Sequence, residues 1–342
     1  MKTSLKIDGG FGFAGEFDST DKLVNKARQL EELGFDGLLV AEMAHDPFLP
    51  LALAAHETSS IELRTSIAVA LARNPMNMAN IGHDLNAYSQ GRFTLGLGSQ
   101  IKPHISKRFN MPWHGPAKQM REFIEATRAI WNCWYDGERL EYSGDCYSYR
   151  LMTPEFTPTN TEHGRPKILM AAVGPLMTQT AAAVADGIIV HAFCSEQHFK
   201  EVMLPQLETD LAANGRSVED FEIQFPVFVA QGETEEELEK SKMGIKYRLG
   251  FYASTPAYKT VLDTHGWGDL QPRLNRLTKD GKWEQLPREI PDEMLYAFAA
   301  VGGPLEVAQQ LKDRFGGLVD RVALEAHYKP DILEQQMNIL RA

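Results

Sequence analysis

The sequence has few cysteines, no excess of basic residues and no long apolar run. Its 342 residues include only Cys133, Cys146 and Cys194, and no two of them form a CxxC pair. This spacing argues against a disulfide scaffold and favours reduced thiols. The 35 Lys and Arg against 46 Asp and Glu give a formal charge of −11, which argues against a nucleic-acid partner because such proteins need a basic face.

Membrane and targeting signals are also missing. The most apolar run, residues 47–55, is about half as long as a membrane-spanning helix. The N-terminal residues lack the apolar stretch and small-residue cleavage site of a signal peptide. We therefore expect a cytoplasmic protein with no membrane partner.

One sequence pattern matches a dinucleotide-binding motif, but the residues around it do not suit such a site. Residues 10–15 match GxGxxG after a predicted strand. The helix-capping residues come only at residues 18–20, and Phe11 and Phe13 would crowd an approaching pyrophosphate. We therefore favour a glycine-rich barrel loop over a dinucleotide site.

No metal, hydrolase or nucleotide-phosphate motif is complete. His56-Glu57 begins HExxH, but Ser60 replaces the second histidine. The ten histidines show no other ligand spacing, and neither GxSxG nor GxxxxGK[ST] occurs. We therefore expect no metal site, no α/β-hydrolase triad and no P-loop.

Strand-like and helix-like segments alternate along almost the whole chain. Continuous apolar segments such as 35–40 are typical of strands buried on both faces of a parallel sheet. Capped amphipathic segments such as 18–33, followed by Gly34, are typical of helices. Further strand candidates are 3–8, 63–71, 93–97, 167–171, 187–190, 221–230 and 319–324, and further helix candidates are 47–60, 75–88, 117–134, 176–185, 196–214, 234–252 and 304–315. About eight strands and eight helices in alternation predict one α/β domain over residues 1–342, a (β/α)8 TIM barrel.

Three segments interrupt the alternation. Residues 99–116 form a long loop after the fourth strand, and residues 137–152 are predicted to be an added β-ribbon. Residues 255–291 follow the seventh strand and carry Trp267, Trp283 and several prolines. Because long loops in compact domains are often functional, we expect a site loop at 99–116 and an inserted, lid-like segment at 255–291. The alternative for the second insert is an oligomer contact.

Motifs at successive strand ends form a more specific set than any single motif. Strand three is followed by Ala72-Arg73-Asn-Pro75, and strand four lies in Leu85-Asn-Ala-Tyr-Ser-Gln-Gly-Arg-Phe-Thr-Leu-Gly-Leu-Gly98. Ala171-Ala-Val-Gly-Pro175 follows strand five, and Ala185-Asp-Gly187 precedes strand six. Over residues 5–325 this order resembles the bacterial luciferase-like superfamily, and within it the branch that uses the deazaflavin coenzyme F420 in place of FMN.

The resemblance implies a barrel that binds the cofactor at the ends of its strands. Relatives carry a non-prolyl cis peptide in a bulge after strand three, against the flavin, which corresponds here to Ser66–Ile67, with Ala68 following. Backbone N–H groups of Ala172, Val173 and Gly174 would hold the phosphate, since a helix begins behind them. The alternative for Gly174 is an ordinary tight turn. Further cofactor contacts implied by the resemblance are Glu42, Gly98, Ser99, Gln100 and His104.

The same resemblance marks acid/base candidates and two departures from one branch. Sugar-phosphate dehydrogenases of this kind have Asp-His after strand two and an acid in the loop after strand four. This chain has Glu42-Met43 and Ile101 there, which weakens a sugar-phosphate reading. We expect His45 or Asp46 to handle the proton, or His191 after strand six; the alternative is that His45-Asp46 caps the following helix. After the last strand, Glu325 and His327 are further candidate substrate contacts.

Together these features predict an oxidoreductase that transfers a hydride between an organic small-molecule substrate and F420. The alternative on the same barrel is an FMNH2-dependent monooxygenase, and a non-catalytic cofactor carrier is a third hypothesis. Relatives are commonly dimers through helices two and three, and the apolar stretch 47–55 suits such an interface. We therefore expect a homodimer or higher homo-oligomer. An acidic protein would hold an anionic cofactor with local donors, and Lys102, His104, Lys107 and Arg108 cluster in one loop.

Overall fold

A computed structural model describes residues 2, 4–11, 17, 19–324 and 329–342. Two of the sequence candidates, Glu325 and His327, lie outside the described residues, as does most of the Gly10–Gly15 loop.

The chain forms two compact units. The N-terminal unit comprises Asp8–Ala172 and Gln179–Ile189. The C-terminal unit comprises Met1–Ile7, Val173–Thr178 and Val190–Ala342.

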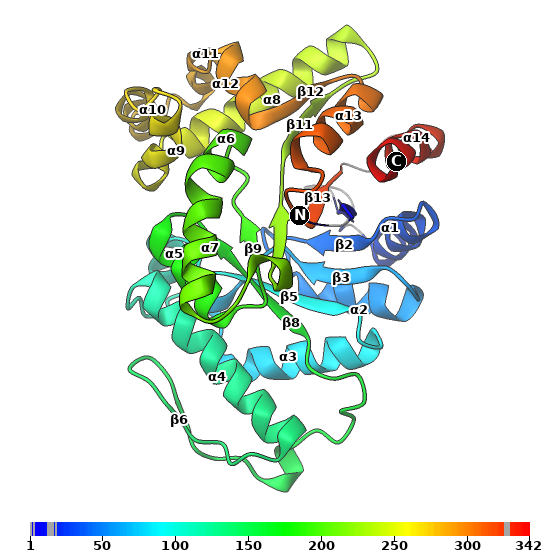
Figure 1. The fold of residues 1–342 in the computed structure, drawn as a ribbon, viewed down its shortest axis with the longest axis vertical. Helices are drawn as coiled ribbons and strands as arrows, with labels where there is room; N and C mark the ends of the chain where they lie inside the picture. The colour runs from blue at the N-terminus through cyan, green and yellow to red at the C-terminus, as the bar shows by residue number, and fades with distance from the viewer. Residues whose placement is uncertain (1, 3, 12–16, 18, 325–328) are drawn as a thin grey trace. The chain divides into compact units, whose positions relative to one another are not determined.

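The N-terminal unit contains a parallel sheet whose strands are joined by helices (Figure 1). Its strands are β1 (Lys6–Gly10, from Asp8 on), β2 (Gly37–Val40), β3 (Glu62–Thr65), β4 (Ala68–Val69), β5 (Phe93–Gly98), β8 (Lys167–Ala172) and β9 (Gly187–Val190, up to Ile189). The neighbours run β1-β2-β3-β5-β8-β9, and β4 extends the pairing along β5. Every residue of β5 is buried, as expected of a strand covered on both faces.

Helices pack around this sheet in chain order. They are α1 (Thr20–Glu32), α2 (Phe48–Glu57), η2 (Ala70–Ala72), α3 (Pro75–Tyr88), η3 (His104–Arg108), α4 (Pro116–Asp136), η4 (Pro154–Phe156) and, from Gln179 on, α5 (Pro175–Val184). Asn74 caps α3, since its side chain accepts a hydrogen bond from the Asn77 N–H, and Pro75 follows at the position where a missing N–H costs nothing. Helix α3 lies beside α4 (Figure 1), where the Trp131 indole donates to the Ala79 carbonyl at 3.1 Å.

The predicted ribbon at 137–152 is confirmed. Strands β6 (Tyr142–Ser143) and β7 (Ser148–Tyr149) pair antiparallel, with Tyr142 opposite Tyr149. The predicted strand 63–71 is instead two short strands, β3 and β4, because the chain bulges at Ser66–Ile67 between them.

The C-terminal unit contains two parallel strand pairs. Strand β10 (Glu222–Phe225) pairs with β13 (Arg321–Ala323), and β11 (Phe228–Gln231) pairs with β12 (Ala299–Gly302). The single strand predicted at 221–230 is therefore wrong. It divides at Pro226, because proline has no N–H to donate to a neighbouring strand.

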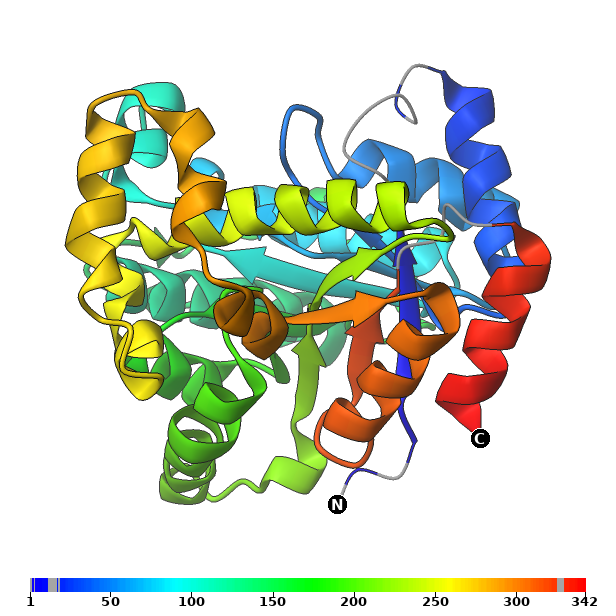
Figure 2. The same cartoon turned by 90° about the horizontal axis from the view of Figure 1, so that it is seen from above.

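Most of the C-terminal unit is helical (Figure 2). Its helices are α6 (Glu196–His198), η5 (Phe199–Met203), α7 (Leu204–Ala213), η6 (Val218–Asp220), α8 (Glu235–Ala253), η7 (Pro256–Tyr258), α9 (Lys259–Thr264), α10 (Leu270–Lys279), η8 (Trp283–Gln285), α11 (Leu286–Glu289), α12 (Asp292–Phe298), α13 (Pro304–Phe315) and α14 (Pro330–Arg341). The helix predicted at 196–214 contains the wider π turn η5, because Pro205 cannot donate the regular backbone hydrogen bond.

The segment predicted to be an insert, residues 255–291, folds into short helices with their own core. Leu262, Leu274 and Leu286 are fully buried and belong to one apolar cluster with Leu249 of α8. Burying a leucine contributes about 1.5–3 kcal/mol, so this segment is anchored to α8 by several such side chains. Its role as a lid stays a prediction.

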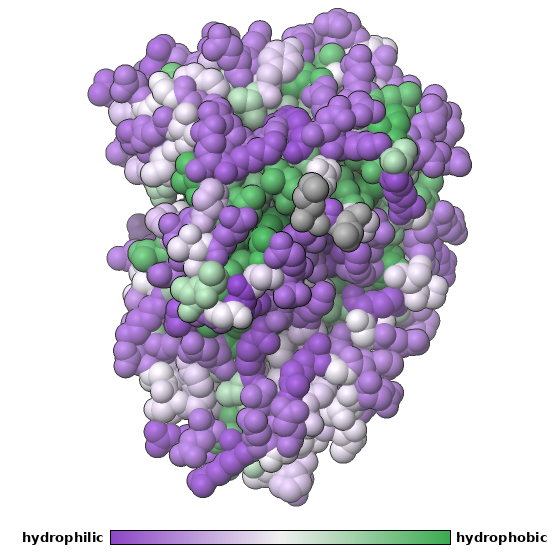
Figure 3. Space-filling model, viewed as in Figure 1, coloured by the Kyte–Doolittle hydropathy of each residue, from purple (hydrophilic) through white to green (hydrophobic). Residues whose placement is uncertain are grey.

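Hydrophilic residues cover most of the face shown in Figure 3, which agrees with the charged residues making up 24% of the chain. Among the described residues, no helix combines the length and apolar character needed to cross a membrane.

Candidate active site

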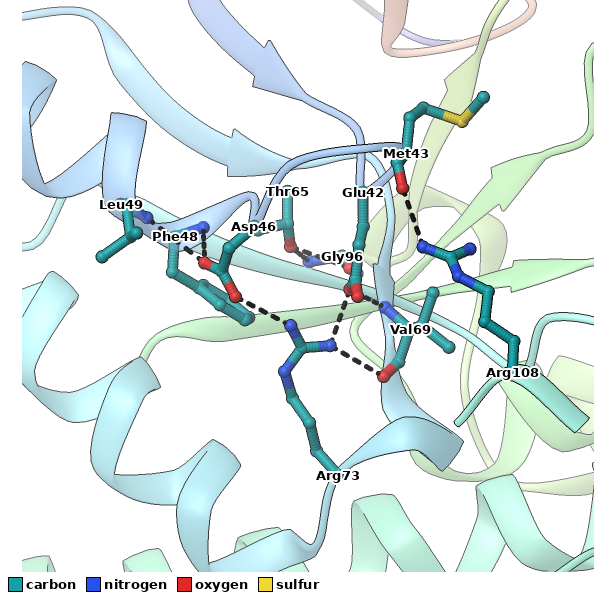
Figure 4. A network of polar contacts seen from close by, with 10 residues as sticks. All are labelled: Glu42, Met43, Asp46, Phe48, Leu49, Thr65, Val69, Arg73, Gly96 and Arg108. Atoms are coloured by element: carbon teal, nitrogen blue, oxygen red, sulfur yellow. Dashed lines mark hydrogen bonds and ion pairs between the residues drawn. The ribbon is translucent and has the colours of Figure 1, made fainter. Parts of the chain in front are cut away.

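A buried carboxylate lies where β2 ends (Figure 4). One Glu42 carboxylate oxygen, Oε2, accepts hydrogen bonds from the Val69 N–H at 2.7 Å and from Arg73 Nη1 at 2.6 Å. Its side chain is only 7% exposed. Because a buried carboxylate needs a charged partner, the Arg73 guanidinium is what allows Glu42 to sit here.

Arg73 joins this carboxylate to a second one. Its Nη2 donates to Asp46 Oδ2 at 2.9 Å, and its Nη1 also donates to the Val69 carbonyl at 3.1 Å. The guanidinium also lies over the Phe48 ring at 5.3 Å. The sequence interpretation singled out the Arg-x-Pro pattern but did not place Arg73 in the site, although that pattern was the available signal.

Asp46 caps a helix as well as pairing with Arg73. Its Oδ1 accepts from the backbone N–H groups of Phe48 at 2.8 Å and Leu49 at 3.4 Å, in the first turn of α2. The capping interpretation is therefore confirmed for Asp46. Its catalytic role stays a prediction.

His45 takes no part in this network. It is exposed and its ring stacks on Phe17, with centroids 4.7 Å apart and planes within 4°. It makes no hydrogen bond within the described residues. An exposed, unpaired imidazole can exchange a proton with a ligand, so the catalytic prediction for His45 remains open.

The bulge after β3 has the geometry that the resemblance implies. The Ser66–Ile67 peptide bond is cis. The Ser66 N–H donates to the Val40 carbonyl at 2.8 Å, and the Ile67 carbonyl accepts from the Glu42 N–H at 3.0 Å. Glu42 and the bulge are therefore brought together at the ends of β2 and β3.

The end of β5 lies against the same bulge. Ala68 pairs with Leu97 in parallel register, and a Cβ placed on Gly98 would come within 2.9 Å of the Ile67 side chain. Gly98 therefore leaves room for Ile67 to lie across the strand end. The structure thus gathers Glu42, Ile67, Ala68 and Gly98 in one place.

The loop after β5 begins with an unusual backbone. Gln100 has φ of 58°, in the left-handed region that side chains other than glycine seldom occupy. Its side-chain Oε1 accepts from the Ile101 N–H at 3.0 Å, and Ser99 Oγ donates to the Gln100 carbonyl at 3.0 Å. These local hydrogen bonds hold Ser99 and Gln100 in a defined turn.

The basic cluster follows in this loop. Lys102, His104 and Lys107 are exposed, while Ile105 is buried and anchors the turn η3. Arg108 Nη2 donates to the Met43 carbonyl at 3.0 Å (Figure 4), which ties this loop to the one after β2. The three exposed side chains are available to an anionic ligand.

The turn between β8 and α5 has open space beside Gly174. Gly174 has φ of 77°, and a Cβ placed there would have no atom within 4 Å. Helix α5 begins at the next residue, Pro175. Since the first N–H groups of a helix lack intrahelical acceptors and carry the positive end of its dipole, this turn suits an anion.

His191 directly follows β9 and is described within the C-terminal unit. Its Nδ1 accepts from the Phe193 N–H at 3.0 Å, and its Nε2 lies 3.4 Å from the Tyr258 hydroxyl. The Tyr252 ring meets it edge-on at 4.8 Å. Burial lowers the pKa of His191 from 6.5 to about 4, so the ring is neutral at physiological pH.

This lowered pKa predicts an acid-dependent loss of stability. The unfolded chain, with a histidine pKa near 6.5, takes up a proton that the folded chain refuses until about pH 4. The stabilising contribution is therefore complete above pH 6.5 and is lost as the pH falls toward 4. Between pH 7.5 and pH 5 the free energy of unfolding of the wild type should fall by about 2 kcal/mol more than that of His191→Asn.

Urea unfolding at the two pH values measures this difference. The matched control is His114→Asn, because that residue is exposed, its side chain makes no hydrogen bond or ion pair within the described residues, and its loss should leave the pH dependence unchanged. Parallel pH profiles for the wild type and His191→Asn would contradict the assignment.

The model of the luciferase-like monooxygenase family matches residues 7–321. The chain belongs to this family. An uncharacterised protein of Mycobacterium tuberculosis is 48% identical over 318 residues, covering 93% of this chain and 92% of that protein. A 5,10-methylenetetrahydromethanopterin reductase of Archaeoglobus fulgidus is 26% identical over 309 residues, covering 88% of each chain.

Several solved structures share the fold. The coenzyme F420-dependent tetrahydromethanopterin reductase of Methanopyrus kandleri superposes with a TM-score of 0.73 at 21% identity, covering 98% of this chain and 97% of that one. An F420-dependent secondary alcohol dehydrogenase gives 0.75 at 14% identity, covering 99% and 100%. An FMN-containing component of 3,6-diketocamphane monooxygenase from Pseudomonas putida gives 0.66 at 17%, covering 100% and 97%. The chain is a (β/α)8 barrel, as the alternation of elements predicted.

Proposed function

We propose that this protein is an oxidoreductase that binds coenzyme F420 and moves a hydride between it and an organic substrate. The observation that carries the proposal is the Gly174 turn, with open space beside Gly174 at the start of α5. It supports a cofactor phosphate at this turn, in a chain whose relatives by sequence and fold include F420-dependent enzymes. When bound, the deazaflavin supplies two electrons as a hydride at C5.

The residues present fit such a cofactor. Donors come from the N–H groups of Ala172, Val173 and Gly174 at the phosphate end. The exposed Lys102, His104 and Lys107 would attract an acidic cofactor tail. These side chains let one loop bind an anion although the whole chain has a formal charge of −11.

The ring system is assigned to the bulge after β3. Ser66, Ile67 and Ala68 would press on one face of the ring, with Glu42 fixed behind them by Arg73 and the Val69 N–H. Gly98, Ser99 and Gln100 would border it from the end of β5. The acid/base group on the substrate side would be His45, Asp46 or His191.

An FMNH2-dependent monooxygenase is the second candidate, favoured by the fold shared with an FMN-containing monooxygenase component. In either case we propose a homodimer or higher homo-oligomer. Leu49 on α2 supports this, because its apolar side chain is 70% exposed and would be covered in such an interface.

Cofactor titration separates the two candidates. Quenching of tryptophan fluorescence by F420, with weak or no quenching by FMN, is expected. Tight FMN binding without F420 binding would overturn the first choice.

A matched pair of variants tests the phosphate turn. Asparagine and aspartate both tolerate a positive φ and differ only in charge, and the space beyond Gly174 admits either side chain. Gly174→Asp should weaken F420 binding about 10-fold or more relative to Gly174→Asn, because a carboxylate repels the phosphate. Equal dissociation constants for the two variants would remove the phosphate from this turn.

A further inference from the structure

The Tyr258 hydroxyl lies 3.4 Å from Nε2 of His191, within the C-terminal unit. Tyr258 is the last residue of η7, and its ring lies against His191 at 4.9 Å and against Phe193 at 5.8 Å between centroids. Tyr258 and His191 are 67 residues apart in the sequence. His191 itself follows the end of a barrel strand, where ligand-contacting residues gather in this fold.

The hydrogen bonds fix which nitrogen of His191 carries its proton. The Phe193 peptide N–H can only donate, and it lies 3.0 Å from His191 Nδ1. Nδ1 must therefore be the unprotonated acceptor. A neutral imidazole then has its hydrogen on Nε2, which faces the Tyr258 oxygen at 3.4 Å. His191 is thus the donor in this contact, and Tyr258 is the acceptor.

This arrangement directs the Tyr258 hydrogen away from His191. Within the described residues, no acceptor for that O–H is present. Burial raises the pKa of Tyr258 to about 12 and lowers that of His191 to about 4. Both groups therefore keep their neutral forms between about pH 5 and pH 11, and Tyr258 keeps a hydrogen to donate.

The surroundings of the pair are mostly apolar and aromatic. Tyr252 of α8 faces the ring of His191, and its presence adds to the raised pKa of Tyr258. Burial also raises the pKa of Tyr252, and Arg248, one turn earlier on α8, opposes this rise. A hydroxyl in such surroundings donates a stronger hydrogen bond than it would in water.

We propose that Tyr258 donates its hydroxyl hydrogen to an oxygen or nitrogen atom of the substrate, and that His191 is the positioning residue that orients it. The assignment rests on the proposed function and adds a substrate class to it. The reacting carbon should carry a hydrogen-bond acceptor, as in a carbonyl compound, an alcohol or an imine. His191 then acts through Tyr258 and is not itself the base.

Nuclear magnetic resonance of the protein without cofactor tests the geometry. In histidine-labelled protein, the nitrogen shifts of His191 should show the Nε2–H tautomer from pH 6 to pH 8, in the wild type and in Tyr252→Phe. The Nδ1–H tautomer, or a protonated ring over this range, would overturn the proposal. This readout needs neither cofactor nor substrate.

Kinetics test the contact with substrate. With F420 and a panel of secondary alcohols, ketones and imines, Tyr258→Phe should lower kcat/KM about 100-fold while leaving the F420 dissociation constant unchanged. The matched control Tyr252→Phe removes a neighbouring hydroxyl that makes no hydrogen bond to His191, and should stay within about twofold. His191→Gln, which can still donate, should lose less activity than Tyr258→Phe.

The outcomes separate the two proposals. Full activity of Tyr258→Phe in the presence of an active wild type overturns the role of Tyr258 and leaves the proposed function standing. A wild type that turns over no member of the panel with F420 overturns the proposed function, and the substrate role of Tyr258 with it, even where the tautomer is as expected.

Discussion

Replacing Gly96 with alanine is expected to prevent the N-terminal unit from folding stably. A Cβ at this position would lie 1.9 Å from the Thr65 carbonyl oxygen, far inside contact distance. The strands cannot move apart to relieve the clash, because the Thr65 hydroxyl bonds both the Gly96 N–H and the Gly96 carbonyl at 2.8 Å. Overpacking usually costs about 1–3 kcal/mol, and here a backbone atom would have to shift.

We therefore expect Gly96→Ala to lower the free energy of unfolding by at least about 3 kcal/mol, or to yield insoluble protein. Chemical unfolding followed by circular dichroism measures the loss. Two glycine variants serve as controls. Gly98→Ala would crowd the flexible Ile67 side chain, with Ala171 at ordinary contact distance, and should lose less. Gly244→Ala, in open space within α8, should gain about 0.5–1 kcal/mol. A Gly96→Ala protein as stable as Gly98→Ala would show that β3 and β5 lie farther apart.

The barrel was predictable because its strands and helices leave strong local signals. Strand β5 is buried along its whole length, and its sequence is correspondingly apolar. The Asn74-Pro75 pair is typical of a helix start and predicts the beginning of α3. One predicted strand was wrong and one predicted helix is irregular, and the sequence held the cause of both: Pro226 divides the strand, and Pro205 follows a widened turn of the helix. The sequence interpretation also omitted α14, whose buried Leu333, Met337 and Leu340 recur at helical spacing.

The candidate site was less predictable because its contacts join distant parts of the chain. Arg73 is 31 residues from Glu42 and 27 from Asp46, and only the fold decides that one guanidinium reaches both. The resemblance supplied the cis bond at Ser66–Ile67, which no propensity would indicate. Tyr258 had no motif to mark it, and its importance rests on the direction of one hydrogen bond to His191.

Removing Arg73 is expected to destabilise the N-terminal unit through the carboxylate that it leaves behind. In Arg73→Met, Glu42 keeps the Val69 N–H but loses its cationic partner at 7% side-chain exposure. Breaking a buried pair in this way costs about 3–5 kcal/mol. Glu42→Gln retains an acceptor for the Val69 N–H and should cost about 1 kcal/mol.

The double variant Glu42→Gln, Arg73→Met completes the comparison, because it removes both charges and leaves neither stranded. It should be more stable than Arg73→Met alone, with a coupling free energy of about 2 kcal/mol by urea unfolding. The matched cycle of Asp46→Asn with Arg73→Met probes a carboxylate that is 39% exposed, where water replaces the lost partner, and its coupling should stay below about 1 kcal/mol. Additive losses in the Glu42 cycle would mean that water already reaches this carboxylate. Arg73 would then be dispensable for holding Glu42 beside the bulge.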